Sequence, residues 1–182
     1  MQRFSKILHS DFRMTDKHLK YRSFGKHVYE DLVEEFFEKD ISLLEVGTRG
    51  GDSLLLWEQC FPNANIYGID TGDNQRFKPV NSDRINLIIG DGYDKSTFLA
   101  DIKLDIVIDD GSHQLKDMKK FIDIYAPLLN PKGTLIIEDI PKLEWTSELK
   151  DVLQKFPFKK ISILDLRRIN NRWDDIIIVA KK

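Results

Sequence analysis

Short apolar runs alternate with amphipathic stretches along most of the chain. The apolar runs are residues 41–46, 65–70, 85–90, 104–109, 133–139, 161–166 and 175–180. Residues 23–39, 113–129 and 146–156 instead carry apolar side chains at helical spacing, and the last of these opens on a Thr/Ser cap. Asp52 and Ser53 precede LLLWEQC, which also suits a capped helix. Strands that are apolar on both faces and separated by helices are typical of a parallel sheet covered on both sides.

The last two apolar runs are joined only by the polar segment RRINNRWD, residues 167–174. Such a short connection suits an antiparallel hairpin better than a crossover with its own helix. We therefore expect an α/β fold with five parallel strands and one reversed strand at the C-terminal end. In open sheets of this kind, ligands bind at the carboxyl ends of the strands, near the point where the strand order reverses.

Length and composition favour a single domain over residues 1–182, with an N-terminal extension and helix at 1–40 and a core at 41–182. The single cysteine, Cys60, excludes a disulfide within the chain, and the charged N-terminal segment lacks the apolar core of a signal peptide. We expect a cytoplasmic protein. With 28 basic and 30 acidic side chains, the net charge of −2 gives no electrostatic case for binding nucleic acid or a membrane surface.

The stretch LLEVGTRGGDS, residues 43–53, suggests one half of a ligand site. Its glycines allow a sharp turn and a close approach to a ligand, but the spacing matches neither a phosphate loop nor the dinucleotide fingerprint. Glu45, just before the first glycine, suits a ligand with a cationic amino group. Asp70 ends the next strand, where an acid commonly accepts hydrogen bonds from ribose hydroxyls, and Asp91 could meet the exocyclic amine of a base. Each acid alone could be a cap or loop residue; together they predict adenosyl binding.

The stretch LDIVIDDGSH, residues 104–113, suggests the other half. Asp110 and the pair Glu138–Asp139 end two strands that should be neighbours, and three crowded carboxylates favour a bound cation. Oxygen ligands point to Mg²⁺, which usually takes one or two protein carboxylates, so one of the three can be an outer partner. His113 could take the proton of a substrate hydroxyl, whose oxygen would then be a stronger nucleophile.

Plainer interpretations of these residues also stand. Asp110 to Ser112 could only cap the following helix, and Glu138 and Asp139 could be exposed loop acids. Asp109 either faces the amino group of the ligand or holds the turn.

Two of these stretches resemble the class I S-adenosylmethionine-dependent methyltransferases: EVGTRGG (45–51) is similar to their first motif, and IYGID (66–70) to their second. The resemblance implies a Rossmann-like sheet of seven strands, mostly parallel with the last antiparallel, and helices on both faces. It implies S-adenosylmethionine as the cofactor, with the turn 47–51 near its methionine part, Asp70 at the ribose, and Asp91 with Gly92 at the adenine. The predicted cofactor residues are Glu45, Gly47, Thr48, Arg49, Gly50, Gly51, Ser53, Asp70, Asp91, Gly92, Tyr93 and Asp109.

VIDDGSH (107–113) and IIED (136–139) resemble a narrower group, the metal-dependent sugar O-methyltransferases of macrolide pathways and their small bacterial relatives. This resemblance implies that Asp110, Glu138 and Asp139 hold magnesium and that Asp110 and His113 act in catalysis. FPNANIYGID and the upstream TDK (15–17) also look similar to small members of the group. These 182 residues are far fewer than those of the macrolide enzymes, and we expect no counterpart of their additional N-terminal domain, so neither their substrate nor their oligomeric state carries over.

We therefore expect a Mg²⁺-assisted methyltransferase acting on a hydroxyl of a sugar or polyol-bearing small molecule. A homo-oligomer is compatible with this function. The alternatives are a catechol-type acceptor and a cofactor-binding domain without catalysis. A nucleic-acid methyltransferase is disfavoured by the charge and by the absence of an N/D-P-P-Y/F-type motif.

Residues elsewhere carry weaker expectations. Asp16, Lys17, His27 and Tyr29 could reach the substrate or the cleft, and Trp145 could line the acceptor pocket. The arginines of the last hairpin, Arg167, Arg168 and Arg172, suit a solvated charge cluster or contacts to an acidic acceptor.

Overall fold

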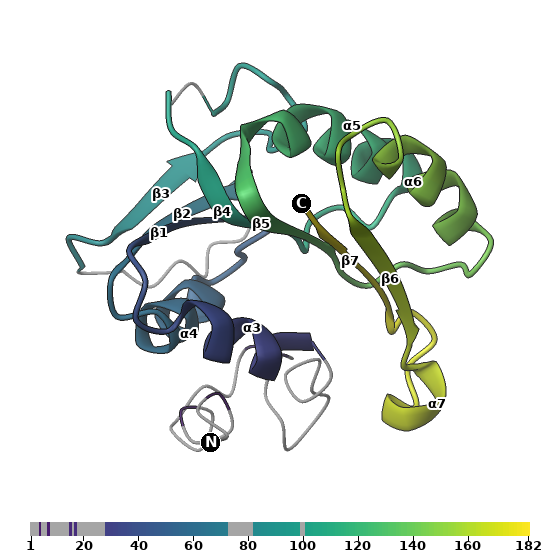
Figure 1. Cartoon of the computed structure of the whole chain (residues 1–182), viewed down its shortest axis with the longest axis horizontal. Helices are drawn as coiled ribbons and strands as arrows, with labels where there is room; N and C mark the ends of the chain where they lie inside the picture. Colours follow the sequence, from purple (N-terminus) through teal and green to yellow (C-terminus); the bar gives the residue numbers. More distant parts are fainter. Residues whose placement is uncertain are drawn as a thin grey trace.

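The computed structural model describes residues 4, 7, 15, 17, 28–72, 82–98 and 101–182, with the side chain of Asn170 left aside. Its centre is a seven-stranded sheet in the order β3-β2-β1-β4-β5-β7-β6 (Figure 1). The strands are β1 (Ile41–Val46), β2 (Ala64–Asp70), β3 (Ile85–Ile89), β4 (Leu104–Asp109), β5 (Leu129–Ile137), β6 (Lys160–Asp165) and β7 (Ile176–Lys181). The strand β7 runs antiparallel to both of its neighbours, β5 and β6, which confirms the predicted reversal of the last strand.

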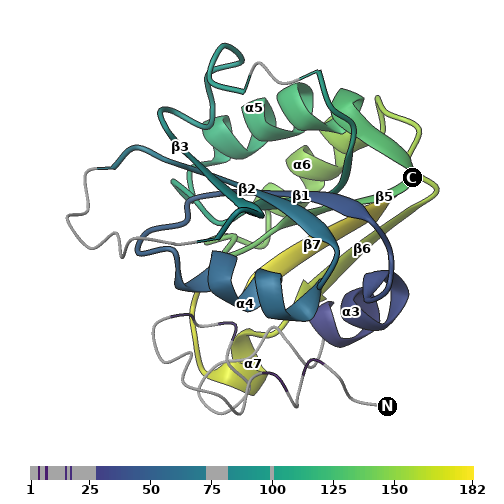
Figure 2. The ribbon, with the colours of Figure 1, turned by 90° about the vertical axis from the view of Figure 1, so that its left-hand side faces the viewer.

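Helices cover both faces of the sheet, as the alternating pattern predicts. In Figures 1 and 2, α3 (Glu30–Phe36) and α4 (Asp52–Cys60) lie on one face, and α5 (Leu115–Tyr125) and α6 (Trp145–Leu153) lie on the other. A 3₁₀ turn, η2 (Ala126–Leu128), follows α5, and α7 (Arg167–Asn170) lies in the final hairpin.

Alternation along the central strands builds two hydrophobic cores. Leu43 of β1 packs into the core under α3 and α4, and the next residue, Leu44, packs into the core under α5 and α6. Ile106 and Val107 of β4 divide in the same way. Successive side chains of a strand point to opposite faces, so a strand that is apolar at every position must be covered on both sides.

Several boundaries differ from the predicted ones. The N-cap of α4 is Gly51, with φ 83°, and no side chain caps this helix, because Ser53 donates its hydroxyl to Glu45 instead. The helix α6 begins at Trp145, and Thr146 donates its hydroxyl to the Leu143 carbonyl. The strand β5 begins at Leu129, earlier than predicted, because its first residue pairs with Leu104 across a register shift.

Two further expectations concern the N-terminal part and membranes. The predicted helix 23–39 corresponds to α3, and residues 23–27 lie outside the described part. Within the described ranges, no helix combines the length and apolar character needed to cross a membrane.

The reversal of strand order lies between β1 and β4, from which the sheet grows in both directions. The turn 47–51 follows β1, and residues 110–113 follow β4. The neighbouring strand β2 ends in Asp70, and Glu138 and Asp139 come directly after β5. The topology therefore gathers both predicted halves of the site at one edge of the sheet.

Candidate active site at the carboxyl ends of the central strands

The glycine turn after β1 packs directly against the segment after β4. Gly47 has φ 89°, and a Cβ atom there would lie 2.1 Å from the Asp110 carbonyl oxygen. The Asp110 amide donates to the Val46 carbonyl at 2.9 Å. Only glycine combines this backbone conformation with such a close approach, so Gly47 joins the two halves of the site.

Asp70 organises the turn with both of its carboxylate oxygens. One accepts the Arg49 amide at 2.7 Å, and the other accepts the Gly72 amide at 3.0 Å. Asp91 accepts the Tyr93 amide at 2.9 Å on an exposed loop, and a Cβ atom at Gly92 would lie 2.4 Å from Val46 Cγ1. The residues predicted to bind the ribose and the adenine thus lie at the carboxyl ends of β2 and β3, at the same edge of the sheet as the Gly47 turn.

Glu45 is fully buried and is engaged within the protein. Its Oε2 accepts the Ser53 hydroxyl at 2.6 Å and the Trp57 indole at 3.1 Å, and its Oε1 lies 3.1 Å from Lys17 Nζ. Burial raises the pKa of Glu45, while the Lys17 ammonium acts in the opposite direction. The cation beside Glu45 in this structure is therefore Lys17, and contact with the amino group of a cofactor stays a prediction.

Asp109 holds the turn after β4. It accepts the Tyr93 hydroxyl at 2.7 Å, and the same hydroxyl oxygen accepts the Ser112 amide at 2.8 Å. Burial raises the pKa of Asp109 to about 7, and burial also raises the pKa of Tyr93. Of the two roles considered for Asp109, these contacts match the structural one.

Asp110, His113 and Asp139 form a group that could hold a metal ion. Each offers one ligand atom, and these atoms all lie within 4.8 Å of one another. His113 and Asp139 have φ angles of 53° and 49°, in the left-handed region that non-glycine residues rarely adopt. Such backbone strain clusters at functional sites, where surrounding structure maintains it.

Glu138 lies apart from that group. It is fully buried; the Tyr29 hydroxyl donates to its Oε1, and Lys17 Nζ lies 3.1 Å from its Oε2. Within the described residues, the structure therefore brings two of the three predicted carboxylates together with His113, and places the third beside Lys17. The role of Glu138 as a metal ligand stays a prediction.

Lys17, which the sequence indicated only as a residue that could reach the substrate, lies among the acids of this site. Its side chain has no exposed surface, and its ammonium lies 2.7 Å from Asp110, 3.1 Å from Glu45 and 3.1 Å from Glu138. We expected it at the substrate. The cluster of acids signals that a basic partner is needed, but nothing local selects one lysine from the 28 basic residues.

Arg172 anchors the final hairpin to the same site. Its guanidinium lies 3.1 Å from Asp139, 3.0 Å from Asp174 and 3.3 Å from Asp175. The expected solvated cluster is therefore wrong for this arginine, which is largely buried because it bridges the end of β5 to the hairpin. Arg167 fits the expectation of a solvated cluster better, because its side chain is more exposed than that of Arg172 and its partner at 2.7 Å, Asp165, is exposed as well.

Trp145, predicted to line an acceptor pocket, is half-buried at the start of α6, packed against the second core, with Lys142 Nζ 5.5 Å from its ring centroid. Of the other N-terminal candidates, Asp16 and His27 lie outside the described residues.

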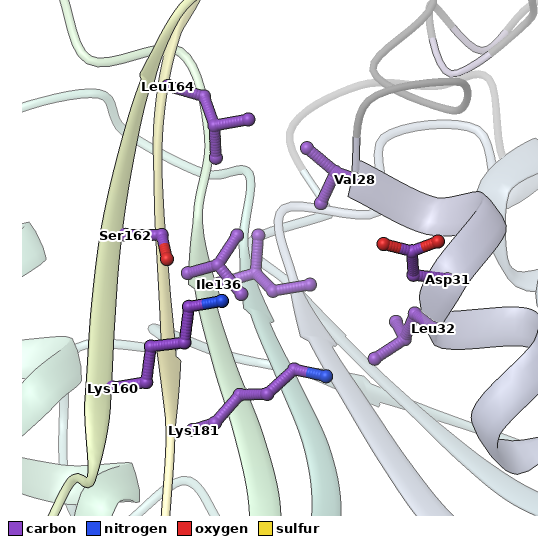
Figure 3. Close-up of a pocket in the computed structure, with 9 residues that line it drawn as sticks. Val28, Asp31, Leu32, Ile136, Lys160, Ser162, Leu164 and Lys181 are labelled. Carbon is purple, nitrogen blue, oxygen red and sulfur yellow. The ribbon is translucent and has the colours of Figure 1, made fainter.

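A pocket of about 220 Å³ lies elsewhere, between α3 and strands β6 and β7 (Figure 3). Its lining is apolar around Leu32, Ile136 and Leu164, with Lys160 and Lys181 at its edge. Lys181 forms an ion pair with Glu35 at 2.7 Å. None of the predicted site residues lines this pocket, so it does not belong to the site at the strand ends.

Comparisons with known proteins point to one family. Residues 44–140 match a family model described as a methyltransferase domain. The chain is 30% identical over 136 residues to an 8-demethyl-8-alpha-L-rhamnosyl tetracenomycin-C 2'-O-methyltransferase of Streptomyces olivaceus, covering 66% of this chain and 35% of that protein. It is 33% identical over 129 residues to a mycinamicin VI 2''-O-methyltransferase of Micromonospora griseorubida, covering 64% and 31%. The chain thus spans about a third of the length of these relatives.

Solved structures agree with the fold. The methyltransferase MycE of the mycinamycin biosynthetic pathway, in complex with Mg and SAH, superposes with a TM-score of 0.74 at 24% identity. The match covers 98% of this chain and 54% of that chain. The predicted Rossmann-like sheet, with its reversed last strand, is therefore confirmed.

Proposed function

Because the chain belongs to the methyltransferase domain family, we propose that it transfers a methyl group from S-adenosylmethionine to a hydroxyl of a sugar or polyol-bearing small molecule, with assistance from Mg²⁺. The observation that carries the proposal is the group of Asp110, His113 and Asp139 beside the Gly47 turn. The names of the similar proteins, which are sugar O-methyltransferases, support this class of acceptor.

The donor set suits magnesium. Asp110 and Asp139 supply hard carboxylate oxygens, and Mg²⁺ usually binds through one or two carboxylates and completes its shell with water and substrate. When bound, Mg²⁺ would act as a Lewis acid toward the acceptor oxygen, and S-adenosylmethionine would supply the methyl group. Imidazole is a poor ligand for a hard ion, which leaves His113 available for another task.

We assign that task as general base. An acceptor hydroxyl beside Asp110 and Asp139 lies within reach of the His113 imidazole, because the ligand atoms of the three residues are within 4.8 Å. His113 would accept the hydroxyl proton on a ring nitrogen. The left-handed backbone at His113 and the Asp109–Tyr93–Ser112 hydrogen bonds just before it fix the stretch of backbone that carries the imidazole.

We assign binding of the adenosyl group to the turn after β1, to Asp70 at the end of β2 and to Asp91 after β3. The helix α4 begins at Asp52, and its N-cap Gly51 provides no side-chain cap, which suits a ligand that approaches the backbone. Asp70 would accept ribose hydroxyls, and Asp91 with Gly92 would flank the adenine. Glu45, which is paired with Lys17, is the residue that would meet the amino group of the cofactor.

The test is methyl transfer to a panel of glycosides and catechols, measured with Mg²⁺ and after complete removal of metal with EDTA. We expect turnover on a glycoside hydroxyl that is lost with EDTA and restored by Mg²⁺. Unchanged turnover without metal would exclude the metal-assisted mechanism. Cofactor binding in a calorimeter with no turnover on any acceptor would favour a binding domain without catalysis.

A further inference from the structure

Lys17 forms a buried junction between three strands of the sheet. Its ammonium contacts Glu45 of β1, Asp110 just after β4 and Glu138 just after β5, at 3.1, 2.7 and 3.1 Å. The Trp57 ring of α4 lies 5.9 Å away, with its face toward the ammonium. A lysine from the N-terminal extension thus lies inside the predicted catalytic core.

The charges around this ammonium make it indispensable to the arrangement. Glu45, Glu138 and Lys17 have no exposed side-chain surface, and Asp110 is 19% exposed. Buried carboxylates without a partner are strongly unfavourable, and three of them around one point repel one another. One ammonium among three carboxylates leaves two negative charges, which a single divalent ion would neutralise.

We propose that Lys17 is a positioning residue that divides the acids of the site into two sets. Its ammonium forms ion pairs with Glu45 and Glu138, and it orients Asp110 by contacting one oxygen of that carboxylate. Asp110 and Asp139 then remain as the carboxylate ligands of the ion, and Glu138 stays outside its inner coordination shell. The part of this inference that concerns the ion rests on the proposed function, whereas the pairing of Lys17 with the acids does not.

The contacts of Glu138 support this division. The Tyr29 hydroxyl donates to one of its oxygens and the Lys17 ammonium contacts the other. Coordination of an ion by Glu138 would bring a second cation next to an oxygen that already contacts the Lys17 ammonium in the buried interior. Asp139, its neighbour in the chain, is paired with Arg172 yet also lies in the group with Asp110 and His113. Two adjacent acids thus have different surroundings, which makes them a matched pair for experiment.

The first experiment titrates the full chain with Mn²⁺, following the free ion by electron paramagnetic resonance, without cofactor or substrate. Asp139→Asn should weaken binding at least about tenfold, the loss expected for a charged ligand. Glu138→Gln should change it by less than about threefold, because its charge serves Lys17. An equal loss in both variants would make Glu138 a direct ligand and would overturn the division.

The second experiment is a double-mutant cycle on thermal unfolding in EDTA. Lys17→Met should lower the melting temperature by roughly 10 °C, since it leaves three carboxylates without their cation. Adding Glu138→Gln to that variant should recover several degrees, although Glu138→Gln alone is destabilising. Lys116→Met, on the exposed face of α5, is the control and should change little. Strictly additive effects would mean that Lys17 and Glu138 are not coupled, and would overturn the pairing.

The two experiments also separate the inference from the function on which it partly rests. If the unmodified protein binds no Mn²⁺, the metal-assisted mechanism fails, and the melting cycle still decides whether Lys17 holds the acids. If Lys17→Met does not fold, the comparison of Glu138→Gln with Asp139→Asn decides alone.

Discussion

The two halves of the site are held in place by different parts of the chain. In the cofactor half, Asp70 is fixed by backbone amides 21 and 2 residues away, those of Arg49 and Gly72. In the reacting half, Asp110 contacts Lys17 across 93 residues, and Glu138 binds Tyr29 across 109 residues. Asp70 and Asp91 of the first half are thus held by backbone amides at the strand ends, whereas Asp110 and Glu138 of the second half depend on distant segments.

This difference has a physical consequence. Backbone amides of a tight turn form a binding surface as soon as the strand and helix beside it form. The reacting acids carry charges that must be neutralised in the interior, so they need cations that only the complete fold supplies. Changes to the N-terminal segment or to the final hairpin should therefore disturb metal binding and turnover before they disturb cofactor binding.

The largest expected effect comes from Asp110, the acid shared by Lys17 and the metal group. Asp110→Asn should reduce methyl transfer by roughly 10²- to 10³-fold, because charge stabilisation at the acceptor oxygen is lost. Binding of S-adenosylhomocysteine, measured by calorimetry, should stay within about threefold. Asp123→Asn, an exposed acid of α5, is the control. Equal losses of turnover and cofactor binding would show that the halves are not separable.

Gly47→Ala should break both halves together, because Gly47 is where they touch. The new Cβ would lie 2.1 Å from the Asp110 carbonyl oxygen, on a backbone with φ 89°. We expect a loss of about 2–4 kcal/mol in the free energy of unfolding, measured with urea. Cofactor binding and Mn²⁺ binding should both weaken. Gly90→Ala is a milder comparison, since its Cβ meets the tip of the Thr97 side chain; equal effects in both variants would contradict this account.

Asp70→Asn tests the cofactor half of the site separately from the reacting half. The amide side chain keeps the shape but loses the charge that the Arg49 and Gly72 amides and the ribose would favour. S-adenosylhomocysteine should bind about tenfold more weakly. Mn²⁺ affinity should not change, and a parallel loss of metal binding would contradict the separation of the halves. Asp83→Asn, an exposed acid before β3, serves as the control.

The smallest expected effect is a change in how stability depends on pH. Burial raises the pKa of Asp109 from 3.8 to about 7, so the folded protein takes up a proton that the unfolded chain releases. The resulting stabilisation is complete below pH 3.8 and is lost as the pH rises through about 7. Urea unfolding in EDTA should therefore show Asp109→Asn lacking this decline between about pH 4 and 7, while Asp123→Asn retains it. An unchanged pH dependence in Asp109→Asn would show that another group is responsible.

Local patterns in the sequence were sufficient for much of this protein. Short apolar runs and the helical spacing of 3.6 residues depend on neighbours in the chain, so the seven strands and the covering helices could be predicted. The short connection at residues 167–174 likewise predicted the reversed β7. The strand-end positions of Asp70, Asp110, Glu138 and Asp139 followed from the same pattern, because parallel strands end at one edge. Helix starts were less certain, since Ser53 and Thr146 donate to other acceptors instead of capping.

The local patterns of the sequence specify the order of the elements and the edge of the sheet at which the acidic and glycine residues gather. Which acid contacts which cation depends on the folded structure. The sequence names Lys17, Tyr29 and Arg172 as candidates for the cleft, but they reach their partners from distant segments and no local pattern indicates which acid each one meets. The physical reason is that hydrophobic periodicity is encoded over a few residues, whereas neutralisation of buried charge depends on whatever the finished fold brings within about 3 Å.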